Sequence, residues 1–344
     1  MRDQFFLVGL LVVAWTELLG ANALSTQFQE QRIQLPNDIS ASVISGLPSK
    51  ITRPRKKLPI LVFLHGSFHG AWCWEERFFP YFVSLGYPVV AFNWRGTHGT
   101  PAGEGVTKVK AAEHCQDLQG FLDQLPDIVG KEFEDRLPVL ISHSFGGIVV
   151  MKYLEECSMK PKELFAGLIT MCSVPPSGNG KLTLRYLKRS IRDSWKITAG
   201  FAMKKCTSDA SLCRDLFFGG SPAVLDDGTV DDFGVSDSDI ERYQAYFKRD
   251  TDATIDLLDL GRKLPSFQSD KEGRAPFVND LPPTLVIGAS DDFIVDEQAN
   301  METAKYFGLE APIIVDSPHD VMLGRKWKNC ADAIHKFIEE QITS

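Results

Sequence analysis

A serine between small residues, placed directly after an apolar run, is the first group in this chain that could act as a nucleophile. The apolar residues at 137–141 are followed by SHSFGG at 142–147, where a helical pattern begins. A buried strand that turns sharply into a helix exposes the hydroxyl at the turn, so the pattern predicts a nucleophilic Ser144. The sequence matches the pattern G-x-S-x-G except that Ser142 occupies the first position. That position needs a small side chain, because strand and helix approach each other closely there.

A base and an acid follow two later strand-like runs. The run at 284–288 precedes Asp291 and Asp292, and the run at 313–315 precedes His319 after three further residues. Polar residues just past the carboxyl ends of strands are where open α/β sheets build their sites. A serine hydroxyl is a poor nucleophile, so His319 would take its proton and return it to the leaving group.

The order Ser, Asp, His along the chain is that of the α/β-hydrolase fold, and it differs from the order in other serine-protease folds. The carboxylate would hold the imidazole in the correct tautomer and stabilise the imidazolium. We expect Asp292 in this role, because the Phe-Ile-Val after it resembles the hydrophobic turn that follows the acid in this fold. Asp291 is the alternative; otherwise it is a solvated or turn-capping carboxylate.

Two backbone N–H groups are expected to hold the oxyanion of the tetrahedral intermediate. Phe145 follows the nucleophile and begins a helix, whose N-terminal dipole favours negative charge. Ser67 lies in the loop HGSFHG at 65–70, after the apolar run at 60–64, and by its spacing supplies the second donor. We expect His65 to be structural and His69 to be either structural or at the pocket mouth.

The hydrophobic pattern predicts strands that alternate with helices, and hence a mostly parallel sheet with helices on both faces. The strands are expected at 31–35, 40–44, 59–65, 87–93, 137–143, 165–171, 284–289 and 312–316. The helices are expected at 74–85, 109–125, 146–157, 297–307 and 327–341. This core comprises residues 24–174 and 277–344.

Residues 175–276 interrupt the alternation with a helical pattern that lacks strand-like runs, and we expect this lid segment to cover Ser144. Residues 181–205 hold eight Lys or Arg and one acid, whereas residues 226–241 hold seven acids and no Lys or Arg. Leu184, Leu187, Ile191 and Trp195 fall on one helical face. Two alternatives stay open: this face packs on the core, or it makes a peripheral contact with an anionic membrane.

The amino terminus resembles a secretory signal peptide. Met1-Arg2-Asp3 precedes an apolar stretch from Phe5 to Trp15, and an Ala-x-Ala site ends at Ala23. Eleven apolar residues are too few to span a bilayer comfortably, so cleavage after residue 23 and entry into the ER are expected. An uncleaved anchor is the alternative.

Charge and cysteine spacing exclude other classes of function. The formal net charge is −8 with no basic tail, which argues against nucleic acid as a partner. The seven cysteines have no CxxC spacing, so we expect no zinc site and no metal. In the ER, Cys206 and Cys213 would be the pair to check for a disulfide, although scattered buried thiols are the better expectation.

Three runs resemble plant and algal hydrolases of the α/β-hydrolase superfamily, many of them plastid proteins. These runs are HGSFHGAWCW at 65–74, CSVPPSGNG at 172–180 and RYL at 185–187. Over residues 59–340 the resemblance implies a carboxylic-ester hydrolase without a cofactor, of the esterase or lipase type. It assigns the nucleophile to Ser144, the acid to Asp292, the base to His319 and the oxyanion donors to Ser67 and Phe145.

Relatives in that wider group include chlorophyll-dephytylating enzymes and lipases, so the expected substrate is a lipophilic ester of a lipid or an isoprenoid. The expected location is the secretory pathway, or the plastid if the source is an alga whose plastid is entered through the ER. The alternatives are a cofactor-free lyase or C–C hydrolase on the same triad, and a slow-turnover ligand receptor that signals through its lid.

Overall fold

The computed structural model describes residues 28–49 and 57–343. An eight-stranded sheet forms its centre, in the order β1-β2-β4-β3-β6-β7-β11-β12. The first two strands run antiparallel to their neighbours, and the pairs from β4 onward are parallel. The bounds are β1 (Gln29–Leu35), β2 (Ile39–Gly46), β3 (Leu61–Leu64), β4 (Val89–Phe92), β6 (Val139–His143), β7 (Gly167–Met171), β11 (Thr284–Asp291) and β12 (Ile313–Pro318).

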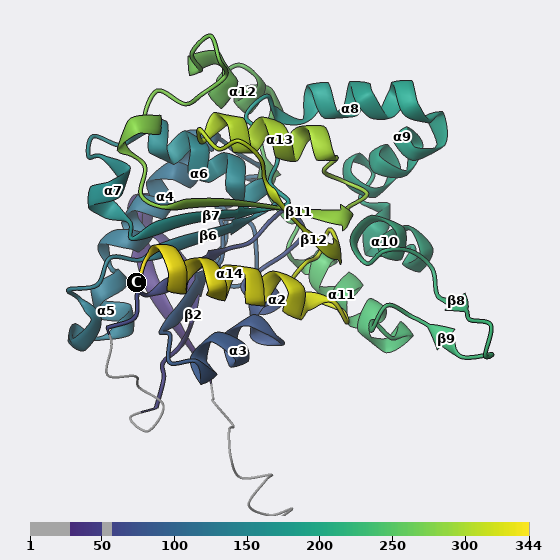
Figure 1. Cartoon of the computed structure of the whole chain (residues 1–344), viewed down its shortest axis with the longest axis horizontal. Coiled ribbons are helices and arrows are strands. Elements are labelled where there is room, and N and C mark those ends of the chain that lie inside the picture. The colour runs from purple at the N-terminus through teal and green to yellow at the C-terminus, as the bar shows by residue number, and fades with distance from the viewer. Residues whose placement is uncertain (1–27, 50–56, 344) are drawn as a thin grey trace, which may run out of the picture.

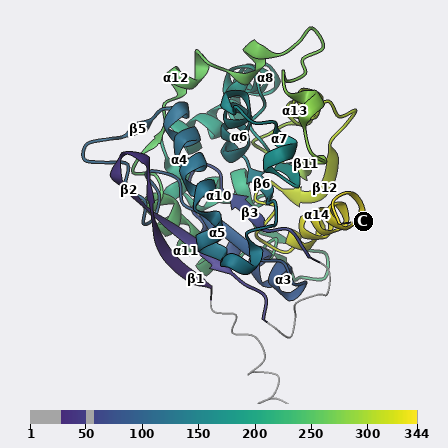
Figure 2. The same cartoon turned by 90° about the vertical axis from the view of Figure 1, so that its left-hand side faces the viewer.

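Alternate residues of each central strand face two separate cores. Leu61 and Phe63 of β3 join the core under α2 (Trp72–Glu75), α3 (Phe78–Ser84) and α14 (Trp327–Gln341). Val62 and Leu64 join the opposite core, under α4 (Ala111–Asp123), α5 (Leu125–Val129) and α6 (Phe145–Glu156). Helices α7 (Pro161–Leu164) and α13 (Glu297–Tyr306) complete the outer layers, which Figures 1 and 2 show on the two sides of the sheet. This architecture confirms the predicted α/β-hydrolase fold.

The prediction of one continuous helix at 74–85 is wrong, because the segment forms two helices, α2 and α3. The residue before α3, Arg77, has φ −131° and ψ −55° and breaks the helical path. Pro80 explains the break: inside a continuous helix its ring would clash with the carbonyl of Glu76, whereas a first helical turn tolerates proline.

The segment 175–276 contains five helices and, contrary to expectation, three short strands. Its helices are α8 (Gly178–Arg189), α9 (Ile191–Ile197), α10 (Ala210–Phe217), α11 (Asp237–Arg249) and α12 (Leu257–Gly261). Strands β8 (Ala223–Val224) and β9 (Val230–Asp231) form a hairpin, and β10 (Thr254–Ile255) pairs in parallel with β5 (Lys108–Val109). Two-residue strands are too short to give a periodic signal.

The single amphipathic helix expected after residue 181 is also divided. Ser190 is extended, with φ −163° and ψ 121°, and its hydroxyl accepts a hydrogen bond from the N–H of Asp193 at the start of α9. A serine that caps a new helix competes with continuation of the old one. Figure 1 shows α8 to α11 beside the carboxyl ends of the strands.

The questions of a signal peptide, a disulfide and a membrane span concern the chain as a whole. The predicted signal peptide at 1–23 lies outside the described residues, and it stays a prediction. All seven cysteines are free, so Cys206 and Cys213 are not paired. In the described part of the chain no helix is long and apolar enough to cross a membrane.

Candidate active site

Ser144 stands on a strained turn between β6 and α6. It has φ 52° and ψ −118°, a conformation that residues with a side chain rarely adopt. Two glycines allow this turn and the loop at 65–66 to approach each other closely. A Cβ on Gly66 would lie 2.8 Å from the Cβ of Ser144, and a Cβ on Gly146 would lie 2.8 Å from the carbonyl oxygen of His65. The small residue expected at 142 is a buried serine, whose hydroxyl donates to Ile169 O at 3.4 Å.

His319 contacts both Ser144 and Asp292. Its Nε2 lies 3.1 Å from the Ser144 hydroxyl oxygen, and its Nδ1 lies 2.9 and 2.8 Å from the two carboxylate oxygens of Asp292. With the proton on Nδ1 donated to the carboxylate, Nε2 is free to accept the serine proton. The structure therefore brings together three of the residues expected from sequence, which come from the ends of three different strands.

The two neighbouring carboxylates have different surroundings. Oδ1 of Asp292 accepts hydrogen bonds from the N–H groups of Ile294 and Val295, at 2.7 and 2.8 Å, which fixes its direction. Asp291 is exposed, and its carboxylate lies 3.4 Å from Nζ of Lys326. Of the two candidates, only Asp292 contacts the imidazole of His319.

Cys172 is a further group at this carboxylate, and the sequence argument missed it. It follows β7 with φ 47°, and its buried sulfur lies within 4.8 Å of the Asp292 carboxylate and of a ring nitrogen of His319. Burial, and then the charge of Asp292, raise the pKa of the Cys172 thiol well above its usual range. Its place after a strand next to β6 and β11 is the signal that could have identified it.

The two expected oxyanion donors, Ser67 and Phe145, line one small cavity of about 40 Å³. In the described part of the chain, neither N–H meets a backbone acceptor. His65 holds the loop that carries Ser67: its Nδ1 donates to Gly66 O at 2.9 Å, and its Nε2 accepts from the N–H of Trp94 at 3.3 Å. Burial lowers the pKa of His65 to about 4, which keeps this tautomer neutral.

His69 is buried and does not lie at an exposed mouth of the pocket. Its Nδ1 donates to Ser67 O at 2.8 Å, and its Nε2 donates to Asp320 at 2.9 Å. Burial acts to lower the pKa of His69, but the nearby Asp320 carboxylate outweighs it and the pKa is raised. The pair joins the loop of Ser67 to the residue after His319.

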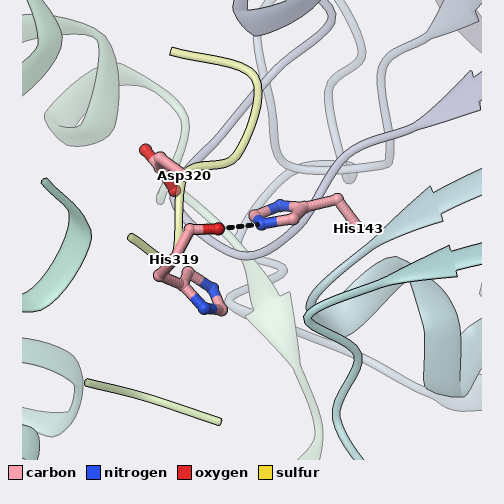
Figure 3. A group of neighbouring side chains, drawn as sticks. All are labelled: His143, His319 and Asp320. Carbon is pink, nitrogen blue, oxygen red and sulfur yellow. Dashed lines mark hydrogen bonds between the residues drawn. The ribbon is translucent and has the colours of Figure 1, made fainter. Parts of the chain in front are cut away.

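Figure 3 shows a further histidine, His143, beside His319 and Asp320. Its Nε2 donates to the backbone carbonyl of His319 at 3.0 Å. His143, His319 and Asp320 lie close enough to hold a cation, and so do Cys172, Asp292 and His319. Both sets include His319, whose two ring nitrogens already contact Ser144 and Asp292, so a bound ion would disrupt that arrangement.

Aromatic side chains of residues 175–276 close the site. Ser144 is 8% exposed and His319 1%. The ring of Phe217 lies 6.1 Å from that of His319, and Phe68 contacts Phe201 and Phe247, at centroid distances of 5.3 and 6.3 Å.

Comparisons with known proteins agree with this geometry. A family model described as "Alpha/beta hydrolase family" matches residues 61–333. Methylesterase 2 of Arabidopsis thaliana is 31% identical over 94 residues, which is 27% of this chain and 32% of that protein. A probable esterase of Oryza sativa subsp. indica is 26% identical over 132 residues, 38% of this chain and 46% of the esterase. The chain thus spans less than half the length of these curated relatives.

Solved structures share the fold over 91% or more of the chain at low identity. A bacterial membrane phospholipase A has a TM-score of 0.61 at 17% identity and covers 100% of this chain and 99% of its own. An epoxide hydrolase from Vigna radiata has a TM-score of 0.56 at 17% identity, covering 91% and 99%. At these identities the likeness shows the fold alone.

Proposed function

The chain belongs to the alpha/beta hydrolase family, and on that basis we propose that it cleaves a carboxylic ester through an acyl-enzyme on Ser144. One observation carries the proposal: the hydrogen-bonded series Ser144, His319 and Asp292, with both imidazole nitrogens in use. Hydrolase relatives named as esterases support the ester as the bond that is cleaved.

In the acylation step, His319 takes the proton of Ser144 while the serine oxygen attacks the ester carbonyl. The carbonyl oxygen becomes an oxyanion, and the N–H groups of Ser67 and Phe145 would donate to it. The C–O bond to the alcohol then breaks, and His319 gives its proton to the departing alkoxide. Asp292 stabilises the imidazolium between these two transfers.

In the deacylation step, a water molecule takes the place of the alcohol. His319 accepts a proton from this water, and the resulting hydroxide attacks the acyl carbonyl. The bond to the Ser144 oxygen breaks, the serine regains its proton, and the carboxylic acid leaves. No group beyond the side chains, the two backbone donors and water is needed for this cycle.

We propose that the ester is lipophilic, a lipid or isoprenoid ester. The support is the cluster of aromatic rings beside His319 and on the loop of Ser67, formed by Phe68, Phe201, Phe217 and Phe247. Burying an apolar chain against such rings is favourable by about 25 cal/mol per Å² removed from water. Esters of this kind reside in membranes, so the proposal includes a peripheral membrane contact of the segment 175–276.

A panel of esters, from short acyl to phytyl, tests the proposal with wild type and Ser144→Ala. We expect a burst of alcohol followed by linear turnover in wild type, faster with longer chains, and neither phase in Ser144→Ala. Turnover that survives the substitution would contradict the mechanism. A single slow turnover with a stable adduct would indicate a ligand receptor instead, and cleavage without water uptake would indicate a lyase.

A further inference from the structure

Helices α8 and α9 present large apolar side chains to solvent. Together, residues 178–197 form the α8–α9 arm. Leu184 and Leu187 are each 52% exposed, Trp195 is 57% exposed and Ile191 83%. These are the four residues that the sequence placed on one helical face. The structure does not pack them on the core, so nothing in the described part of the chain accounts for their apolar character.

The opposite side of the arm is firmly attached to the rest of the molecule. The hydroxyl of Tyr186 contacts the carbonyl oxygens of Phe293 and Ile294, at 2.7 and 2.8 Å. Arg185 forms a two-pronged ion pair with Asp296, with N–O distances of 2.7 and 2.6 Å. The exposed face is therefore a fixed surface, anchored on the loop that follows Asp292.

The charge of the arm is opposite to that of the protein. Residues 178–197 hold six Lys or Arg and one acid, in a chain of net charge −8. Lys181, Lys188 and Arg192 are exposed on the arm itself. Basic residues beside exposed aliphatic side chains and a tryptophan are typical of helices that lie in a membrane interface. The indole of tryptophan suits that position, since its ring is apolar and its N–H polar.

We propose that the α8–α9 arm docks on an anionic lipid surface. Ile191 and Trp195 would enter the boundary between headgroups and acyl chains, and Lys188 and Arg192 would contact the headgroup anions. The arm lies at the outer edge of the molecule, away from the sheet, so a lipid surface can reach it (Figure 1). The consequence for catalysis rests on the proposed function: docking would bring a lipophilic ester next to the loop that holds Asp292.

Vesicle sedimentation tests this with Ser144→Ala protein, so that binding is measured without hydrolysis. We expect binding to vesicles of phosphatidylcholine with phosphatidylglycerol, and much weaker binding to phosphatidylcholine alone. Added salt should release the protein. Lys188→Ala and Arg192→Ala should each weaken binding about fivefold, because a basic side chain near an anionic surface contributes roughly that much. Ile191→Ser should weaken it about tenfold.

Matched controls change the same residue types elsewhere. Leu258→Ser on α12 and Lys336→Ala on α14 replace exposed residues far from the arm in sequence, and neither should change binding. The vesicles should also shift the tryptophan emission of the protein to the blue, and Trp195→Phe should remove most of that shift. Because all the substituted residues are exposed, circular dichroism should show the fold unchanged.

Two results would overturn the inference: no binding to anionic vesicles, or binding that the arm variants and the control variants reduce equally. Binding to an acidic polypeptide but to no vesicle would also overturn it, in favour of a protein partner. These outcomes differ from failure of the proposed function. That failure would appear as absent turnover of soluble esters by wild type, whatever the vesicles show.

Discussion

Nε2 of His69 lies 2.9 Å from a carboxylate oxygen of Asp320, and both side chains are buried. The pair connects two loops that are 251 residues apart in sequence. One loop carries Ser67, whose carbonyl accepts from the other nitrogen of His69 at 2.8 Å. The other carries His319, directly before Asp320. The proposed oxyanion donor and the proposed base are thus held by one buried ion pair.

Asp320→Ala should destabilise the protein by roughly 3 kcal/mol, because it leaves the buried His69 ring without its carboxylate partner. Asp320→Asn should cost less, since its amide can donate to a neutral imidazole. Chemical unfolding of both variants measures the difference. An Asp320→Asn variant as stable as wild type would mean that the charge of this pair has no role.

The contact between His69 and Asp320 should make the stability of the protein depend on pH. The folded pKa of His69 is raised above its ordinary value of 6.5, with burial acting against the shift and Asp320 causing it. The stabilising contribution is fully present below the unfolded pKa and is lost as pH rises through the folded pKa. The free energy of unfolding should therefore fall as the pH rises above the ordinary His69 pKa of 6.5, and fall less in Asp320→Asn. Parallel pH curves for the two proteins would contradict this.

We expect substitutions of the adjacent residues Asp291 and Asp292 to lower kcat to very different extents. Asp292→Asn should lower kcat about 10⁴-fold, because the amide would favour the wrong tautomer of His319. Asp291→Asn removes only an exposed contact to Lys326 and should change kcat less than twofold, within the range of about 0–1 kcal/mol for a surface pair. Steady-state kinetics on one chromogenic ester compares them. The reverse ranking would show that the acid is misassigned.

Gly66→Ala should damage the turn at Ser144 more than the fold. The new Cβ would lie 2.8 Å from the Cβ of Ser144, closer than such atoms approach each other. We expect a loss of activity of at least about tenfold, on the scale of a displaced oxyanion donor. Gly180→Ala is the matched control, because its Cβ meets nothing within 4 Å and it should stabilise α8 by about 0.5–1 kcal/mol. Equal activity of both variants would be contrary to the close approach described at Gly66.

Cys172 should resist alkylation in the native protein. Burial and the Asp292 charge raise the pKa of its thiol, and only the thiolate reacts at an appreciable rate. Iodoacetamide at mildly alkaline pH should leave activity unchanged and leave the peptide of Cys172 unmodified, whereas the unfolded protein should react there. Rapid inactivation with modification at Cys172 would mean that the thiol is exposed or ionised.

The core could be predicted from sequence because its signals are local. The runs at 60–64, 137–141 and 285–287 are apolar throughout, as expected for strands buried on both faces, and each ends where a polar or small residue begins. The order of Ser144, Asp292 and His319 along the chain predicted the fold. The Phe-Ile-Val after Asp292 favoured this residue over Asp291 as the acid. In the structure two of those three residues, Ile294 and Val295, supply the N–H groups that orient the carboxylate.

The remaining features depend on contacts between distant residues. Nothing in the spacing of His69 and Asp320 indicates that they pair, and Cys172 is identifiable only once β7 is known to lie between β6 and β11. In the segment 175–276, helical periodicity identified an apolar face but not whether it is covered. That depends on Ser190, which ends α8 and caps α9, and on Tyr186 and Arg185, which attach the opposite side.

The most direct measurement is the mass of the active-site peptide after a short reaction with a slowly hydrolysed ester, quenched in acid. Our account predicts an acyl group on Ser144, formed at the rate of the burst and absent from Ser144→Ala. Turnover of the ester with no covalent intermediate, or with the acyl group on another residue, would contradict it.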